Sequence, residues 1–248
     1  MFHFLKKLKN YFIGNLATDE AFRYRPIAQS LKKKADRQST IGEIGSGDVG
    51  ISPYFSKAEI LGLDVYFANS RIGKLKKIIY DGHTIPFPVD YFDFLVSADC
   101  LEHVKPENRK KFIAELLRVG RKEIYLIFPS GAKAAQSDQA LDLIIKKYHH
   151  SQDGYLREHL EYGLPELGTI EEYLQEAASN QHKTIEYSIK KIMNIKLRNS
   201  YIQAKFKGGL GRNIFYFLFL LLLPFSKLFN FGDCYWRLIN IRIKSYER

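Results

Sequence analysis

Residues 40–50 read TIGEIGSGDVG and join a short β-branched run to a loop rich in glycine. The glycines Gly45, Gly47 and Gly50 match the pattern G-x-G-x-x-G, which can follow the first strand of an α/β sheet. Glycine lets the backbone turn sharply and approach a ligand closely. The pattern predicts a nucleoside-binding loop, but it does not distinguish a dinucleotide from another nucleoside ligand.

The charge around this loop separates the two kinds of ligand. No Lys or Arg occurs from residue 38 to residue 56, whereas Glu43 and Asp48 both lie at the loop. A pyrophosphate is anionic and favours nearby cations, so the loop suits a dinucleotide poorly. Carboxylates instead favour a ligand that carries a positive charge.

Acidic residues also follow the later apolar runs. Asp64 ends the run LGLD, 17 residues after Gly47, and Asp81 and Asp99 end the next two runs. Open α/β sheets bind ligands at the carboxyl ends of their strands, where an acid can bind both ribose hydroxyls of an adenosine. Each acid taken alone also fits a purely structural role, since Asp starts turns and caps helices. Together they predict a ligand with an adenosine and a positive charge.

Short β-branched runs alternate with helical patterns from about residue 40 onward, which is typical of βαβ units and a parallel sheet. We expect parallel strands at residues 40–44, 59–63, 77–80, 94–97 and 123–128, and two later strands at 184–190 and 235–243. We expect helices at residues 19–34, 52–55 with a few residues more, 69–75, 106–119, 132–148 and 170–178.

Several motifs occur in a fixed order between the first and fifth expected strands. They are the loop at 43–47, the acid Asp64, the segment 81–83, and the runs at 85–93 and 94–104. In this order and at this spacing they resemble the class I S-adenosylmethionine-dependent methyltransferases. The resemblance implies a Rossmann-like α/β fold with helices on both faces of a seven-stranded, mostly parallel sheet and an antiparallel final hairpin. It also implies S-adenosylmethionine as the cofactor.

The same resemblance implies cofactor contacts residue by residue. Glu43 would help to orient the amino group of the cofactor, Asp64 would bind the ribose, and Asp81 would bind the adenine amino group. The loop departs from the family pattern because the third glycine would fall at Val49, and the chain has Gly50 one position later. The implied contacts are Glu43, Gly45, Ser46, Gly47, Asp64, Val65, Asp81, Gly82, Ala98, Asp99 and Leu101.

Methyl transfer needs a general base only if the acceptor must lose a proton, as a hydroxyl does. The candidate bases are His103, Asp99 and His159. His103 lies in the run LEHV, which often shapes a loop in this family, and His159 lies in a polar segment where the family commonly builds substrate lids. Asp99, Glu102 and His103 also resemble a run of quinone O-methyltransferases, but such residues more often make hydrogen bonds at a helix start than hold a metal. We therefore expect no metal.

The composition excludes several classes of protein. With 46% hydrophobic residues among 248, the chain can bury a sizeable core and lacks the signature of disorder. The two cysteines, Cys100 and Cys234, exclude a disulfide-stapled scaffold and argue against a Cys-rich zinc module. A reducing, cytoplasmic setting fits best.

The net charge of +11 belongs to the flanks of the chain. It is +6 over residues 1–37, −5 over 38–177 and +10 over 178–248, so the expected site is acidic and we expect no nucleic-acid partner. We expect four parts: a basic helical segment at 1–37, a cofactor-binding core at 38–194 with a lid at 131–180, an apolar helical insertion at 195–233, and a last strand at 234–248.

Two segments are compatible with contact with an anionic membrane surface. Residues 214–225 read IFYFLFLLLLPF and are too short for an ordinary spanning helix, and residues 1–13 are basic with an amphipathic pattern. Burial in the core explains the apolar run equally well. The sequence therefore leaves open a peripheral location on the inner face of a membrane, and it leaves the oligomeric state open.

The sequence as a whole favours a methyltransferase that moves a methyl group to a small-molecule, lipid-linked or glycan acceptor, at oxygen. Two alternatives remain at this stage. A non-catalytic module could keep the S-adenosylmethionine-binding fold, and a nicotinamide-dependent reductase shares the glycine pattern but lacks the context of the DGH and LEHV runs.

Overall fold

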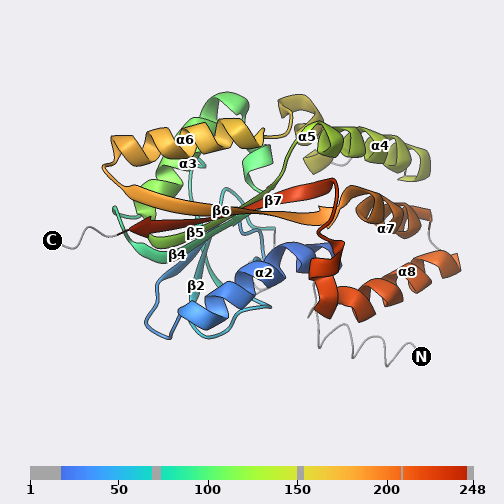
Figure 1. Cartoon of the computed structure of the whole chain (residues 1–248), viewed down its shortest axis with the longest axis horizontal. Helices are drawn as coiled ribbons and strands as arrows, with labels where there is room; N and C mark the ends of the chain where they lie inside the picture. Colours follow the sequence, from blue (N-terminus) through green and yellow to red (C-terminus); the bar gives the residue numbers. More distant parts are fainter. Residues whose placement is uncertain (1–17, 69–73, 150–153, 208, 245–248) are drawn as a thin grey trace.

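The computed structural model describes residues 18–68, 74–149, 154–207 and 209–244 (Figure 1). Its centre is a seven-stranded sheet in the order β3-β2-β1-β4-β5-β7-β6. The first five strands are parallel, and β7 is antiparallel to both of its neighbours. The strands are β1 (Ile41–Ile44), β2 (Ile60–Asp64), β3 (Leu75–Ile79), β4 (Phe92–Ala98), β5 (Gly120–Pro129), β6 (Thr184–Asn194) and β7 (Cys234–Lys244). The predicted Rossmann-like sheet and its antiparallel hairpin are confirmed.

Helices cover both faces of this sheet (Figure 1). Helix α2 packs on one face, and α3 and α6 pack on the other. The helices are α2 (Thr18–Lys34), α3 (Pro106–Val119), α4 (Ala132–His149), α5 (Gly154–Tyr162), α6 (Leu167–Asn180), α7 (Ile195–Lys207) and α8 (Gly209–Leu222), with 3-10 segments η1 (Leu101–His103) and η2 (Leu223–Phe229). The last three helical segments lie between β6 and β7, within the stretch 195–233 that we expected to be an apolar insertion.

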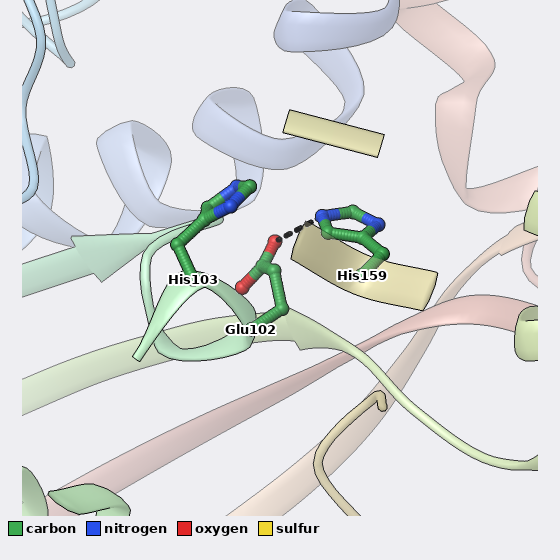
Figure 2. A group of neighbouring side chains, drawn as sticks. All are labelled: Glu102, His103 and His159. Carbon is green, nitrogen blue, oxygen red and sulfur yellow. Dashed lines mark ion pairs between the residues drawn. The ribbon is translucent and has the colours of Figure 1, made fainter. Parts of the chain in front are cut away.

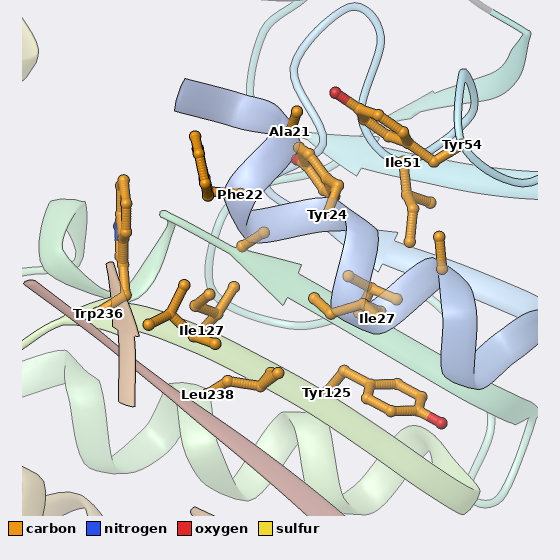
Figure 3. Packing of buried hydrophobic residues seen from close by; sticks show 14 of the residues in the cluster. Ala21, Phe22, Tyr24, Ile27, Ile51, Tyr54, Tyr125, Ile127, Trp236 and Leu238 are labelled. Carbon is orange, nitrogen blue, oxygen red and sulfur yellow. The ribbon is translucent and has the colours of Figure 1, made fainter. Parts of the chain in front are cut away.

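Successive side chains of each strand point to opposite faces of the sheet, so each face has its own hydrophobic core. Ile27 of α2 packs with Tyr125, Ile127 and Leu238 of the sheet, as Figure 3 shows. On the other face, Leu95 and its neighbours in the sheet pack against α3 and α6. All seven residues of β4 are buried because both faces of the strand are covered, and for this reason it reads as a nearly continuous apolar run.

Two local expectations are wrong. Residues 52–54 form turns rather than a helix, and the N–H groups of Ser52 and Tyr54 donate to carbonyls three residues back, those of Val49 and Ile51. The segment after α4 contains the helix α5, which was expected to be part of a loop. Leu156 is the one buried residue in the described helix α5, so the sequence of this helix shows little apolar periodicity. The amphipathic segment at 1–13 and most of the helix expected at 69–75 lie outside the described residues.

Candidate functional site

The parallel strands bring the predicted acids to one edge of the sheet. β1 pairs with β2 and β4 in parallel register, so Gly45, Asp64 and Asp99 all lie at their carboxyl ends. The Asp64 carboxylate accepts the N–H of Gly47 at 2.7 Å and the N–H of Val65 at 2.7 Å. Asp64 therefore ties the glycine loop to the end of β2.

The three glycines of the loop serve different purposes. All have positive φ, with values of 72° at Gly45, 54° at Gly47 and 49° at Gly50. A Cβ at Gly45 would lie 2.4 Å from Cys100 Sγ, and one at Gly50 would lie 2.1 Å from Glu43 Oε2, so both positions lack room for a side chain. A Cβ at Gly47 would meet no protein atom within 4 Å. Gly47 thus lines open space at the edge of the sheet, where a ligand can approach the backbone.

Glu43 is fully buried beneath this loop. Its Oε2 atom accepts the N–H of Ile51 at 2.8 Å, and burial raises the pKa of its carboxyl to about 7. This contact explains why the third glycine of the loop is at position 50, because a side chain there would displace the Glu43 carboxylate. Ser46 is also buried, and its hydroxyl donates to the carbonyl of Gly47 at 3.0 Å.

An ion pair between Arg23 and Asp99 closes the edge of the sheet on the side of α2. Asp99 has a φ of 47°, so its carboxylate leaves the direction of β4. Arg23 Nε and Asp99 Oδ1 are buried, and neither has a hydrogen-bond partner among the described residues. A guanidinium donor and a carboxylate acceptor side by side match the carboxylate and the ammonium of an amino acid. The methionine end of S-adenosylmethionine carries these two groups, so the residues present fit the implied cofactor.

The residues that the sequence predicts for the adenosine end follow β2 and β3. Asp81 is exposed and accepts the N–H groups of His83 and Thr84 at 2.8 Å each, which hold the pKa of its carboxyl below the usual range. Gly82 has a φ of 77°, and a Cβ there would lie 2.9 Å from Val65 Cγ1. Val65 is 58% exposed, so it presents an apolar surface beside this turn. Ala98 and Leu101 are both buried in this structure.

A cluster of ionisable side chains follows β4 (Figure 2). Glu102 and His103 belong to η1, and His159 comes from α5. Glu102 is fully buried, burial raises the pKa of its carboxyl to about 7, and neither of its oxygens has a hydrogen-bond partner among the described residues. His159 Nε2 faces it at 3.9 Å from Oε1. The rings of His103 and His159 lie 4.9 Å apart between centroids.

Each imidazole of this cluster is oriented by a carboxylate. His103 Nδ1 lies 2.8 Å from Glu158, and His159 Nδ1 lies 2.9 Å from Asp138. Asp138 is 1% exposed and also accepts the hydroxyl of Tyr235, and Arg198 lies 3.6 Å from it. Because the Asp138 carboxylate accepts hydrogen bonds, Nδ1 of His159 donates to it, and Nε2 is left facing Glu102.

Sequence reasoning identified both histidines but missed the residues that orient them. Asp138 lies in α4, while Arg198 and Tyr235 lie in the insertion and in β7, and no motif joins them. It also missed Arg23, which lies 76 residues from Asp99 in the chain. The signal that could have located Arg23 was the expected helix at 19–34, because a helix there covers one face of the sheet. Asp99, a candidate base, is instead paired with Arg23 at the edge near β1.

We expect Asp64→Ala to weaken S-adenosylmethionine binding about 5- to 150-fold, or roughly 1–3 kcal/mol, because the loop and the ligand both lose a carboxylate acceptor. Isothermal titration calorimetry measures the change. Asp64→Asn is the matched variant, since it keeps the size and one acceptor, and its loss should be smaller. Unchanged affinity in both variants would show that Asp64 does not contact the cofactor.

Comparison with known proteins finds a family match over part of the chain. Residues 42–128 match a family model described as a methyltransferase domain. No curated protein matches the sequence. The matched residues run from β1 to the end of β5 and include Gly45, Asp64, Asp81 and Asp99.

Solved methyltransferase structures share the fold of nearly the whole chain. The plantazolicin methyltransferase BpumL in complex with SAH is 16% identical, covering 97% of this chain and 90% of its own, with a TM-score of 0.54. A putative methyltransferase from an antibiotic biosynthesis pathway of Anabaena variabilis is 14% identical, covering 89% and 98%, with a TM-score of 0.52. Phosphoethanolamine N-methyltransferase 2 of Haemonchus contortus is 12% identical, covering 97% and 60%, with a TM-score of 0.50. At these identities the likeness shows a common fold.

Proposed function

We propose that this chain, a class I S-adenosylmethionine-dependent methyltransferase, transfers the methyl group to an oxygen atom of a small-molecule, lipid-linked or glycan acceptor. The observation that carries the choice of oxygen is the His159–Asp138 pair beside the carboxyl end of β4. An imidazole with a fixed tautomer is suited to accept a proton, and a hydroxyl acceptor must lose one.

Bound S-adenosylmethionine supplies an electrophilic methyl group on a sulfonium. The residues of this chain then have to position the acceptor in line with that methyl group and exclude water, which supplies much of the acceleration. Arg23 and Asp99 would hold the methionine end, and Asp64 would hold the ribose. Nε2 of His159 is buried beside Glu102, so the acceptor hydroxyl would have to enter this cluster for Nε2 to take its proton while Nδ1 stays hydrogen-bonded to Asp138.

His159 is a better candidate base than the other two residues. Asp99 is engaged by Arg23, and His103 is oriented by Glu158, whose side chain is about one-third exposed. Asp138 is buried and held by Tyr235, so it fixes His159 more firmly. A rigidly oriented base is the more effective one, because proton transfer requires the right geometry before the right pKa.

The test is a methylation screen. Purified protein, S-adenosylmethionine and fractionated cell extracts are incubated, and mass spectrometry searches for metabolites that gain one methyl group and depend on the protein. We expect a product methylated at oxygen, together with formation of S-adenosylhomocysteine. Methylation at nitrogen or carbon would refute the choice of oxygen, and tight binding of NAD with no binding of S-adenosylhomocysteine would refute the cofactor site.

We propose that the reaction needs no metal ion, although Glu102, His103 and His159 offer ligand atoms within 4.8 Å of one another. Treatment with EDTA should therefore leave kcat unchanged within about twofold, since an imidazole can take the proton directly. Plasma mass spectrometry of the purified protein provides an independent reading of bound metal. Loss of activity that magnesium or zinc restores would show that the three side chains hold a cation instead.

A further inference from the structure

Helix α8 and η2 present a stripe of large apolar side chains to solvent. Leu210 is 74% exposed, Phe225 is 60% and Leu228 is 71%. We define the α8–η2 surface by six residues of this stripe, Leu210, Ile214, Leu218, Leu221, Phe225 and Leu228. Spacings of three and four residues place the members from α8 on one face of the helix. Contiguous apolar surface of this kind marks a site of interaction with a protein or a membrane.

Phe219 attaches α8 to the domain from the opposite side of the helix. Phe219 is 5% exposed, and its ring lies 5.7 Å from Phe22 and 4.8 Å from Tyr201. Leu223 at the end of the helix is fully buried. The helix is therefore apolar on both faces, and its attachment to the domain uses one of them. The exposed stripe is a fixed feature of the surface.

The charge of the surrounding segment points to an anionic lipid surface as the occupant. Residues 195–232 contain no Asp or Glu and six basic residues: Lys196, Arg198, Lys205, Lys207, Arg212 and Lys227. Lys196 and Lys227 are exposed. An apolar helix face within a basic segment is the pattern that binds at the boundary between headgroups and acyl chains, where each cation adds attraction to anionic lipids.

The length of the helix fits a position in the surface rather than across the membrane. α8 spans Gly209–Leu222, and Pro224 lies in the 3-10 turn that follows. Within residues 18–68, 74–149, 154–207 and 209–244, no helix is long and apolar enough to cross a bilayer.

The topology places this surface on the same side of the molecule as the reaction. β6 and β5 both run antiparallel to β7, so β6 is parallel to β5 and ends at the carboxyl edge that carries the site. α7 begins there, and its Arg198 donates to Ser137 of α4 at 3.0 Å and lies 3.6 Å from Asp138. Figure 1 shows α4, α5, α7 and α8 gathered at one end of the sheet.

We propose that the α8–η2 surface binds the protein to an anionic bilayer and that the acceptor is a lipid-linked molecule methylated at the membrane surface. This inference rests on the proposed methyl transfer and names its class of acceptor. The apolar side chains of α8 enter the lipid boundary, and the exposed side chains of Lys196 and Lys227 contact the headgroups. The His159–Asp138 pair then faces an acceptor that arrives from the bilayer.

Co-sedimentation of the full-length protein with vesicles tests the docking surface. We expect binding to vesicles of phosphatidylcholine with about 30 mol% phosphatidylglycerol and much weaker binding to phosphatidylcholine alone, with the difference reduced at high salt. The double variant Leu221→Ser/Phe225→Ser should bind anionic vesicles at least about tenfold more weakly, because two apolar side chains no longer enter the lipid. Val89→Ser is the matched control, since Val89 is 58% exposed and precedes the amino end of β4.

Three outcomes would overturn the inference. The full-length protein does not bind anionic vesicles; or the double variant binds them as well as the parent; or the parent is a dimer that the double variant converts to a monomer, so that a second copy covers the stripe. S-adenosylhomocysteine binding, measured in parallel by calorimetry, should be the same in all variants. That measurement separates failure of the docking surface from failure of the methyltransferase site. With binding established, a radiolabelled methyl group should appear in the lipid extract of cell membranes rather than in the aqueous fraction.

Discussion

His159→Asn is expected to lower kcat about 10²- to 10⁴-fold, the range that a general base contributes. The asparagine amide can still donate toward Asp138, which lies 2.9 Å from Nδ1 in the parent, but the variant has no group in place of Nε2. Steady-state kinetics with the acceptor identified by the methylation screen provides the measurement. The affinity for S-adenosylhomocysteine should stay within about twofold, since His159 acts on the acceptor and not on the cofactor.

Two further variants make this expectation specific. His103→Asn should retain most of kcat, because Glu158 and not a buried carboxylate orients that ring. Asp138→Asn should lower kcat with little change in KM, because it removes the group that fixes the tautomer of His159 while the acceptor contacts remain. If His103→Asn loses activity and His159→Asn keeps it, the base is His103. If neither loses activity, no side chain of this pair takes the proton.

Gly45→Ala is expected to destabilise the fold by about 2–5 kcal/mol and to lower the Tm by roughly 5–15 °C. The added Cβ would lie 2.4 Å from Cys100 Sγ and 2.5 Å from Cys100 Cβ, and the residue has a φ of 72°. The clash and the strained backbone act together, because the loop after β1 lies directly against the segment after β4. Thermal unfolding in the absence of ligand measures the loss.

Gly47→Ala is the matched control and should behave in the opposite way. Its φ of 54° costs roughly 1 kcal/mol with a side chain present, but its Cβ would meet no protein atom within 4 Å. The variant should therefore fold with a small loss of Tm and bind S-adenosylhomocysteine at least about tenfold more weakly, because the methyl group would occupy the space left for the ligand. Normal binding by Gly47→Ala would place the cofactor elsewhere.

Local signals in the sequence were enough to predict the strands and the edge of the sheet that carries the acidic residues. Each strand of the parallel sheet is a short apolar run, and an acid or a glycine loop follows several of them, so residues 40–104 predicted both the sheet and the approximate position of Asp64 and Asp99. Local chemistry sufficed because parallel strands necessarily bring their carboxyl ends to one edge. The predicted helix at 52–55 was wrong for an equally local reason, since the glycine loop continues in turns up to residue 54.

The sequence by itself determined a doubly covered α/β sheet with a glycine loop and carboxylates for a positively charged adenosyl ligand. The tertiary structure decided which charges meet. Arg23 pairs with Asp99 across 76 residues, and Asp138 reaches His159 while Tyr235 reaches Asp138 from β7. It also decided which face of α8 stays in water, because the unbroken run at residues 214–222 has no local period that marks its buried side. Contacts between distant segments depend on how helices pack on the sheet, and no short stretch of sequence encodes that packing.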